Sequence, residues 1–245
     1  MIIAIALALT AGSGTVMAAG VDTALVSAVA LTSDYVHRGL SQSSERPALQ
    51  LSAGLRRSDG YYGHLWLSTL DTRRQAPDFG DRGAQADVVI GLTRPLSDAW
   101  TFDLGLGRYE TFATDQILDY DYTEVSVALA YRDRLRLLYA YSPKATDHTR
   151  EDAKLSGPRH VAEIAYEWPL TRWLSIGSGV GYADLERVSE VRYRFAGVGA
   201  TVRHGRYLAT VNVFTTDGAA RERFVDGRAD TRLVLTLIAR VWGGG

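Results

Sequence analysis

The chain has 245 residues, of which 46% are hydrophobic and 22% charged, with a formal net charge of −1 and no cysteine. This composition is too apolar for a disordered chain and too polar for a bundle of membrane helices, and the balanced charge gives no reason to expect nucleic acid as a partner. Without cysteine, the chain has no disulfides, no thiolate metal site and no cysteine nucleophile. Glycine (24) and tyrosine (13) outnumber proline (6), which favours strands and tight turns.

The N-terminal segment differs from the rest of the chain. Residues 2–11 form an apolar run, and residues 16–18 match the spacing that a signal peptidase reads. We expect residues 1–19 to be a signal peptide and residues 20–245 to form one barrel domain, although no Lys or Arg precedes the run. The alternative is an N-terminal membrane anchor. Residues 12–14 (Gly-Ser-Gly) disfavour it, because they leave the run shorter than the roughly 20 apolar residues of a spanning helix.

From residue 22 onward, apolar and polar residues alternate in segments that turn residues separate, which predicts β-strands. Residues 49–56 are typical, with Leu or Ala at the odd positions and Gln, Ser, Gly or Arg at the even positions. About twelve such segments lie near residues 24–35, 47–56, 61–70, 83–93, 99–110, 120–132, 134–142, 159–168, 173–184, 191–203, 206–215 and 231–242. The first of them and the segment 191–203 alternate least regularly.

The connections between these segments distinguish a membrane barrel from a soluble sandwich. Short links (57–60, 94–98, 133, 169–172 and 204–205) alternate along almost the whole chain with longer polar stretches (36–46, 71–82, 111–119, 143–158 and 216–230), and the long link 185–190 is of modest length. Outer-membrane barrels have this pattern because one rim carries tight periplasmic turns and the other carries extracellular loops. The segments are also commonly about 10 residues long, which suits a tilted strand that crosses the hydrocarbon layer.

Aromatic residues lie near the segment ends in the apolar register, as expected for rings at the level of the lipid headgroups. They are Tyr35, Tyr61, Trp100, Tyr131, Tyr139, Tyr141, Tyr166, Trp168, Tyr182 and Tyr207. The chain is therefore predicted to be an all-β protein, an antiparallel transmembrane β-barrel of about 12 strands in the bacterial outer membrane. Short turns and both termini would lie on the periplasmic side.

The polar register would then face the barrel lumen, because a charged group in lipid costs several kcal/mol. The pore-lining candidates are Arg56, His64, Asp87, Asp103, Glu124, Arg136, Glu163, Glu167, Asn212 and Arg240. Glycines such as Gly105 and Gly181 share this face. They either leave space for water or permit sharp coiling of the sheet.

Two stretches resemble the motifs of a known family. Residues 32–42 (TSDYVHRGLSQ), followed by 47–50 (PALQ), resemble the opening signature of proteobacterial outer-membrane porins of the TorF type, and residues 119–125 (DYDYTEV) resemble the central motif of that family. The resemblance implies an outer-membrane barrel and suggests a porin role, and it brings no catalytic residues. His37 stands where the family pattern has an aromatic residue, and the C-terminus ends in three glycines after Trp242 instead of in an aromatic residue.

The five histidines offer the most direct route to an enzyme, through a His–Ser pair. His64 and Ser68 share one strand face, but four residues along a strand span roughly 13 Å, which is too far for a hydrogen bond. His37 lies near Ser41 and Ser43 in a predicted loop, where the sequence does not define the geometry. We therefore predict no catalytic residues.

The sequence does not predict a metal site either. His148, Asp147, Glu151 and Asp152 cluster in the long stretch 143–158, but basic residues between them neutralise the cluster and no calcium-loop spacing is present. A solvated charged loop is the expected structure. We predict no metal and no cofactor.

The expected function is passive diffusion of small hydrophilic solutes through a narrow lumen in which inward carboxylates face inward arginines. The alternatives are a structural or adhesive barrel with a plugged lumen, a lipid-modifying enzyme of the outer leaflet, and a soluble periplasmic β protein. The expected partners are outer-membrane lipid and lipopolysaccharide, the barrel assembly machinery and the solutes themselves.

Overall fold

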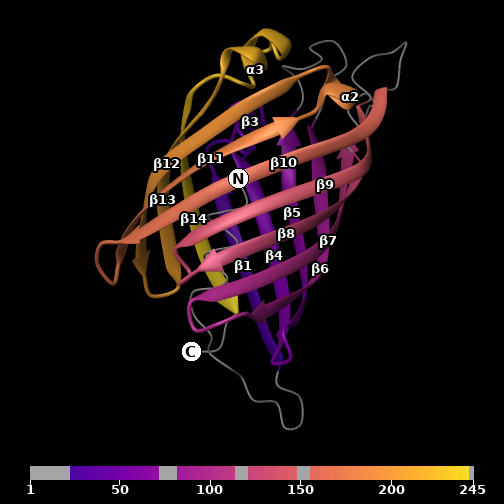
Figure 1. Ribbon diagram of the computed structural model, residues 1–245. Coiled ribbons are helices and arrows are strands. Elements are labelled where there is room, and N and C mark those ends of the chain that lie inside the picture. Colours follow the sequence, from indigo (N-terminus) through magenta and orange to yellow (C-terminus); the bar gives the residue numbers. More distant parts are fainter. Residues whose placement is uncertain (1–22, 72–81, 114–120, 148–154, 243–245) are drawn as a thin grey trace.

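The computed structural model describes residues 23–71, 82–113, 121–147 and 155–242, and these form one closed antiparallel β-barrel (Figure 1). The barrel contains 12 strands, as predicted from the alternation of the sequence. They are β1 (Thr23–Thr32), β4 (Ala48–Arg57), β5 (Tyr61–Asp71), β6 (Arg82–Pro95), β7 (Trp100–Ala113), β8 (Tyr122–Tyr131), β9 (Leu135–Asp147), β10 (Leu155–Pro169), β11 (Leu174–Asp184), β12 (Arg192–His204), β13 (Tyr207–Thr216) and β14 (Arg232–Trp242).

Each barrel strand pairs with its neighbours in the sequence, and β1 closes the sheet by pairing with β14. In this seam Ala28 lies opposite Arg240 and Thr32 lies opposite Thr236. Closure gives the backbone groups of both edge strands hydrogen-bond partners, which a sheet surrounded by lipid requires.

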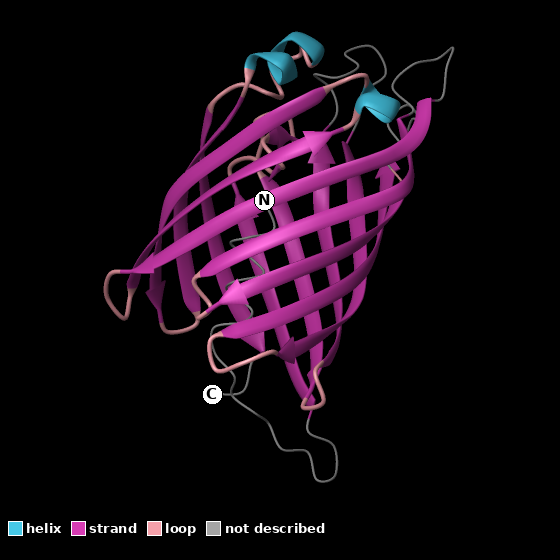
Figure 2. Cartoon of the chain, in the orientation of Figure 1, coloured by secondary structure: helices cyan, strands magenta, loops and turns pink. Residues whose placement is uncertain are grey.

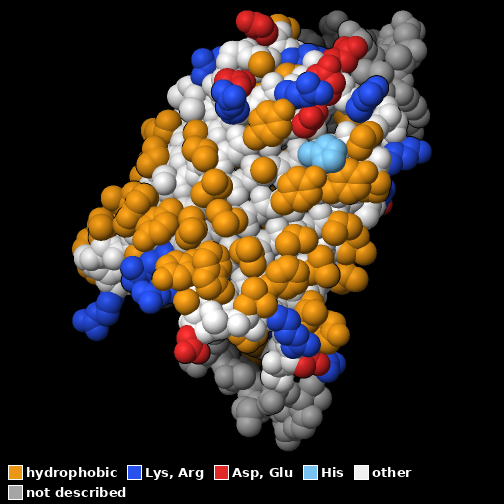
Figure 3. Space-filling view, viewed as in Figure 1, with side chains coloured by type: hydrophobic (Ala, Val, Ile, Leu, Met, Phe, Trp, Pro, Cys, Tyr) orange, Lys and Arg blue, Asp and Glu red, His pale blue; other side chains and the backbone are white. Residues whose placement is uncertain are grey.

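Exposed apolar side chains cover the outside of the barrel. Figure 3 shows them across the middle of one face, with charged side chains gathered toward its upper and lower margins. The alternation is regular: Leu233, Leu235 and Leu237 of β14 are each more than half exposed, whereas Val234 and Ile238 are 3% exposed. A water-soluble protein rarely exposes so large a continuous apolar surface, so this belt is the lipid-facing surface of a membrane-spanning barrel.

The aromatic prediction is confirmed for the side chains on this outer surface and is wrong for one residue. Tyr61, Trp168 and Tyr207 are exposed at strand ends, and Tyr139 is exposed within β9, which runs on to Asp147. Tyr35, in contrast, is 7% exposed and packs inside the barrel, because β1 ends at Thr32 and the chain then turns inward.

The two rims of the barrel differ as the sequence predicted. One rim carries short turns, and the other carries the long connections and two helices, α2 (Glu186–Ser189) and α3 (Gly218–Arg223) (Figure 2). We identify the short-turn rim as periplasmic and the opposite rim as extracellular. Among the described residues, no helix is long and apolar enough to cross a membrane.

Strands β9 and β10 extend further toward the extracellular rim than predicted. Their pairing runs on through Ala145 opposite Gly157 and Asp147 opposite Leu155, after a bulge between Gly157 and Arg159. Apolar alternation stops at the edge of the lipid, but backbone pairing does not need it. The sequence pattern therefore marks the lipid-spanning part of a strand and misses its extension into water.

Contacts with neighbouring inward side chains explain two of the inner-face glycines, for a reason that was not among the two expected. A Cβ at Gly181 would lie 2.1 Å from the ring of Phe195, and a Cβ at Gly105 would lie 2.8 Å from the hydroxyl of Ser126. Glycine fits at these positions because neighbouring side chains occupy the space that a Cβ would need.

The stretch between β1 and β4, predicted as an extracellular loop, folds back into the barrel. It contains the two-stranded hairpin of β2 (Val36–His37) and β3 (Leu40–Ser41), which lies within the extracellular end of the barrel (Figure 1). We call residues 33–47 the lumen hairpin. The predicted signal peptide (1–19) lies outside the described residues, as do His148, Glu151 and Asp152 of the charged cluster.

Candidate functional site

The tip of the lumen hairpin is a two-residue turn that fits tightly against the barrel wall. Arg38 and Gly39 both have positive φ, 49° and 83°, as in the type I′ turns that connect short hairpins. A Cβ at Gly39 would lie 2.7 Å from the Cβ of Phe195 and 2.8 Å from Cγ2 of Thr216. Glycine is therefore required here both by the backbone conformation and by the contact with β12 and β13.

Arg38 connects the hairpin tip to the opposite wall through two carboxylates. Its Nη1 and Nη2 each donate to Glu124 of β8 over 2.9 Å, and its Nε donates to Glu163 of β10 over 3.3 Å. Burial opposes the charge, but the two carboxylates raise the pKa of Arg38 well above its ordinary value. The guanidinium stays charged, and it is held by the bidentate geometry that Arg forms with a carboxylate.

Arg159 approaches the same carboxylate from β10. Its Nη2 lies 3.9 Å from Glu124, and its guanidinium lies 4.0 Å from the ring centroid of Tyr122. A bulge interrupts each of the pairings that flank β9, between Tyr122 and Val125 and between Gly157 and Arg159. Bulges change the direction in which neighbouring side chains point. These two bulges lie next to Glu124 and Arg159, the wall residues grouped around the hairpin tip.

The base of the hairpin is held by a second buried ion pair. Asp34 accepts hydrogen bonds from the hydroxyls of Ser41 (2.7 Å) and Ser43 (2.8 Å) and pairs with Arg232 of β14 over 2.9 Å. Arg232 also donates to the carbonyl of Gly227 in the last loop. Asp34 therefore links the two ends of the hairpin through the serines and links the hairpin to β14 through Arg232, which in turn contacts the last loop.

Apolar contacts fill the space around these polar groups. Leu40 belongs to a buried cluster with Val161 and Tyr193 of the wall and Phe224 of the last loop. Tyr35 packs on Trp66 with ring centroids 4.9 Å apart, and its hydroxyl donates to the Gln85 side chain. The extracellular half of the lumen is thus packed like a protein core.

His37 is the one hairpin side chain in this packed region whose polar atoms find no partner in the described chain. Both ring nitrogens are buried without a hydrogen bond. Burial, followed by the positive charges of Arg38 and Arg159, lowers the pKa of His37 well below its ordinary value. The imidazole is therefore neutral in the packed hairpin.

The periplasmic half of the lumen is more open. Inward polar side chains near the extracellular end, such as Ser68, Asp87 and Glu124, are at most 4% exposed. Toward the periplasmic end, the inward side chains of Asp103 and Glu167 are partly exposed. A cavity of about 100 Å³ lies between the hairpin and this open region, lined among others by Tyr35, His64, Asp87, Asn212 and Thr236.

All ten sequence-predicted lumen residues lie in the inward register of their strands. Glu124 and Glu163 are brought together by Arg38, and Asp87 accepts a hydrogen bond from Gln85. His64 and Asn212 line the central cavity. Arg56, Asp103, Arg136, Glu167 and Arg240 lie toward the periplasmic ends of their strands. The ten do not form a single ring. Glu124 lies near the extracellular end of its strand, whereas charged residues such as Arg56 and Arg136 lie near the periplasmic ends of theirs.

Four arginines of the lumen were missed (Arg38, Arg159, Arg203 and Arg232), and so was Asp34 at the base of the hairpin. A signal for three of them exists in the sequence. Arg159 is in phase with Glu163, Arg232 is in phase with Arg240, and Arg203 occupies the inward register of the irregular segment 191–203. Arg38 lies in a connection and has no phase to count.

The two His–Ser combinations considered from the sequence differ in their surroundings. Ser41 and Ser43 donate to Asp34 and not to His37. Ser68 donates to the carbonyl of Thr69, and Nε2 of His64 has no partner in the described residues. Within those residues, no group of three His, Cys, Asp or Glu side chains could hold a metal ion.

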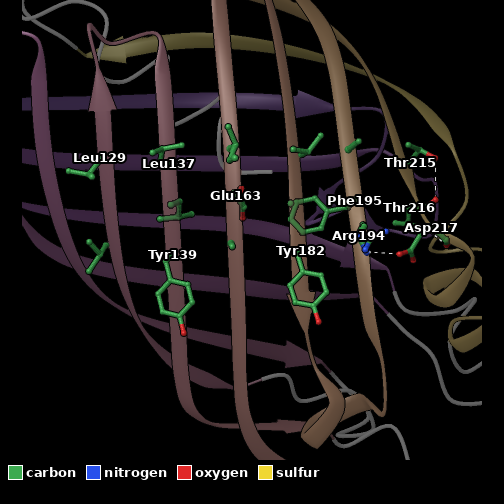
Figure 4. Close-up of a pocket in the computed structure, with 17 residues that line it drawn as sticks. Leu129, Leu137, Tyr139, Glu163, Tyr182, Arg194, Phe195, Thr215, Thr216 and Asp217 are labelled. Atoms are coloured by element: carbon green, nitrogen blue, oxygen red, sulfur yellow. Dashed lines mark hydrogen bonds between the residues drawn. The ribbon is translucent and has the colours of Figure 1, made fainter.

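A second cavity, of about 880 Å³, opens on the outer wall over β10. The rings of Tyr139 and Tyr182 project on either side of this strand (Figure 4), and Ala162 leaves space between them. Near the extracellular rim, the backbone NH of Arg194 donates to Asp217. This cavity opens on the lipid-facing surface of the barrel.

Comparison with known proteins gives a family and a fold. Residues 17–238 match the model of a family described as "Bacterial protein of unknown function" (Gcw_chp). No curated protein sequence matches the chain. Among solved structures, the chain is similar to KdgM porin (TM-score 0.52, 10% identity, covering 88% of this chain and 98% of that one) and to NanC porin (TM-score 0.52, 8% identity, 88% and 98%). At these identities the similarity establishes the fold alone.

Proposed function

This chain belongs to the bacterial Gcw_chp family, whose description carries no activity, and from the geometry of its lumen we propose that it is an outer-membrane porin for small hydrophilic solutes. The lipid-facing belt and the porin fold support the membrane location. The lumen hairpin would form the constriction, and the ten inward residues predicted from the sequence would line the path on either side of it.

One observation carries this proposal: the interior is polar and partly exposed from the periplasmic mouth to the central cavity. Inward side chains such as Asp103, Arg136 and Glu167 remain partly exposed inside a closed barrel. A barrel that served only as a wall could fill its interior with apolar side chains, as small barrels do. Polar side chains that remain accessible to water inside a membrane protein are typical of a solute pathway.

The remaining sequence expectations belong to the same proposal. Residues 1–19 would be removed as a signal peptide and residues 20–245 would form the barrel. Its partners would be the assembly machinery, lipopolysaccharide and the solutes, and the protein would catalyse no reaction. Membership of the TorF type is proposed on the resemblance of the two motifs, and Arg38 of the first motif binds Glu124 of the second.

The test is the conductance of the refolded barrel in planar lipid bilayers. The native chain is expected to give small, reproducible conductance steps, and Glu124→Gln is expected to give larger ones because it removes the main anchor of Arg38. Glu110→Gln, in an exposed pair with Arg108, is the matched control and should conduct like the native chain. Conductance at background level in both the native chain and Glu124→Gln would overturn the porin proposal.

The buried ion pairs of the hairpin favour one second candidate, a structural barrel whose lumen is plugged. Arg38, Glu124, Asp34 and Arg232 are each at most 6% exposed at the side chain, as in a permanent core. A plugged barrel predicts no conductance in any hairpin variant that still folds. The same recordings therefore separate the two candidates.

A further inference from the structure

The periplasmic mouth of the lumen carries an excess of arginine. Arg56 of β4, Arg136 of β9, Arg203 of β12 and Arg240 of β14 all occupy the inward register, and each lies within the last three residues at the periplasmic end of its strand. Arg203 lies opposite Leu208, and Leu208 lies opposite Ile238, two residues before Arg240 on the same face. Arg203 and Arg240 therefore lie two strands apart on the inner wall, at the same end of the lumen.

Only two inward carboxylates of the described strands lie in this half, and one of them is already engaged. Asp103 accepts hydrogen bonds from the hydroxyls of Tyr62 (3.1 Å) and Thr93 (2.8 Å). The other, Glu167, is partly exposed. In the described part of the chain, Arg56, Arg136 and Arg203 form no ion pair, and Nε of Arg203 is buried without a partner.

The arginines of the extracellular half are in the opposite situation. Arg38, Arg159 and Arg232 each lie within 4.0 Å of a carboxylate, so carboxylates of the protein neutralise their positive charge. Among the described residues, Arg56, Arg136 and Arg203 of the periplasmic mouth have no such carboxylate partner. A wall of low dielectric around a narrow aqueous space concentrates such a field and raises the local concentration of ions of the opposite sign.

We infer that the periplasmic half of the lumen is a binding and selection site for small anions that carry a carboxylate or phosphate group. The planar guanidinium donates paired hydrogen bonds to both groups. The claim that the site selects transported anions rests on the proposed function. The claim that the site is positively charged and binds anions does not, and it can be tested without measuring conductance.

The experiment uses the absence of native cysteine. Thr201, inward and partly exposed, lies two residues before Arg203 on the same face of β12. Thr201→Cys in the refolded full barrel provides a single thiol near the site. Its reaction rates with a negatively charged and a positively charged methanethiosulfonate are compared, each divided by the rate with a free thiol in solution.

The anionic reagent is expected to react faster than the cationic one. Adding Arg136→Gln and Arg203→Gln should slow the anionic reagent about fivefold and accelerate the cationic one, because one unit charge at about 4 Å in water is worth about that factor for each reagent. The ratio of the two rates should therefore fall by more than about fivefold. Arg172→Gln with Arg206→Gln is the matched control. It removes the same charge from exposed turns of the same rim, where salt screens it, and should leave the ratio nearly unchanged.

Competing anions identify the chemistry that is recognised. Inorganic phosphate and acetate, added separately at constant ionic strength, should slow the anionic reagent more in the parent than in the Arg136→Gln/Arg203→Gln variant. Preference for phosphate or for acetate assigns the site to phosphate or to carboxylate groups. A parent that favours the cationic reagent, or a ratio that the two lumen substitutions do not change, would overturn the inference.

The outcome is distinguishable from failure of the proposed function. A barrel without conductance but with the expected ratio of rates would be no porin and would still hold the anion site. A conducting barrel with no preference for the anionic reagent would be a porin without that site.

Discussion

The two halves of the lumen have the same wall and opposite interiors. Both are lined by the inward register of the same 12 strands, and both contain arginines and carboxylates. In the extracellular half, the lumen hairpin brings Arg38 to Glu124 and Asp34 to Arg232, and these groups are buried. In the periplasmic half nothing described enters the lumen, and Arg136 and Glu167 stay partly exposed.

This difference shows that the register of a strand decides which way a side chain points, whereas another part of the chain decides whether it meets water. Glu124 and Glu167 both face inward, yet Glu124 is buried against Arg38 and Glu167 is partly exposed. Lumen charges therefore include some that hold the hairpin, such as Glu124, and others that stay partly exposed, such as Glu167. The following predictions are ordered from the largest expected effect.

Glu124→Gln should be the most damaging substitution in the extracellular half. It removes one charge of a buried bidentate pair and leaves Arg38 with Glu163 at 3.3 Å, so the free energy of unfolding should fall by about 3–5 kcal/mol. Urea unfolding of the barrel in lipid vesicles measures this loss. Glu110→Gln, whose partner Arg108 is 45% exposed, should cost less than about 1 kcal/mol.

The double variant Arg38→Met/Glu124→Leu sharpens this result. The single variant leaves the guanidinium of Arg38 buried with Glu163 alone, whereas the double variant removes both buried charges of the pair. The double variant also takes a partner from Glu163 and from Arg159, but these two carry opposite charges, so it should be more stable than Glu124→Gln. Equal losses for Glu124→Gln and the exposed control would mean that the hairpin is not anchored through this pair.

Gly39→Ala should have the next largest effect, because it combines a left-handed backbone with overpacking. Its Cβ would lie 2.7 Å from Phe195, and overpacking of this kind typically costs about 1–3 kcal/mol. Gly205→Ala is the control: its φ is 56° and no atom lies within 4 Å of the added Cβ. The difference in unfolding free energy between the two variants measures the contact of the hairpin tip alone, and no difference would argue against close packing at the tip.

The pH dependence of hairpin packing should be the smallest effect. Because the pKa of His37 in the packed hairpin is lowered, His37 is neutral in both packed and released states above its ordinary value of about 6.5. Below that pH the released hairpin binds a proton that the packed one does not, so packing weakens as the pH falls. The loss of unfolding free energy between pH 7 and pH 5 should be smaller in His37→Phe; an unchanged loss would contradict this role.

The sequence predicted the wall better than the contents of the lumen. The side-chain period of 2 placed all ten candidates on the inner face, including Asn212 between two valines of β13. It could not place Arg38, whose partner Glu124 is 86 residues away and whose turn follows no strand register. The same period was available for Arg159 and Arg203, which lie at the irregular ends of their segments. Counting phase through such ends would have found both.

The pairing of Asp34 with Arg232 has a consequence for the order of assembly. The two residues are 198 positions apart, one just after the first barrel strand and the other at the start of the last. The hairpin is synthesised early, but its base cannot form the ion pair with Arg232 until β14 has paired with β1. An incomplete barrel therefore has an unfastened entrance, and sealing of the extracellular mouth reports that the final seam has closed.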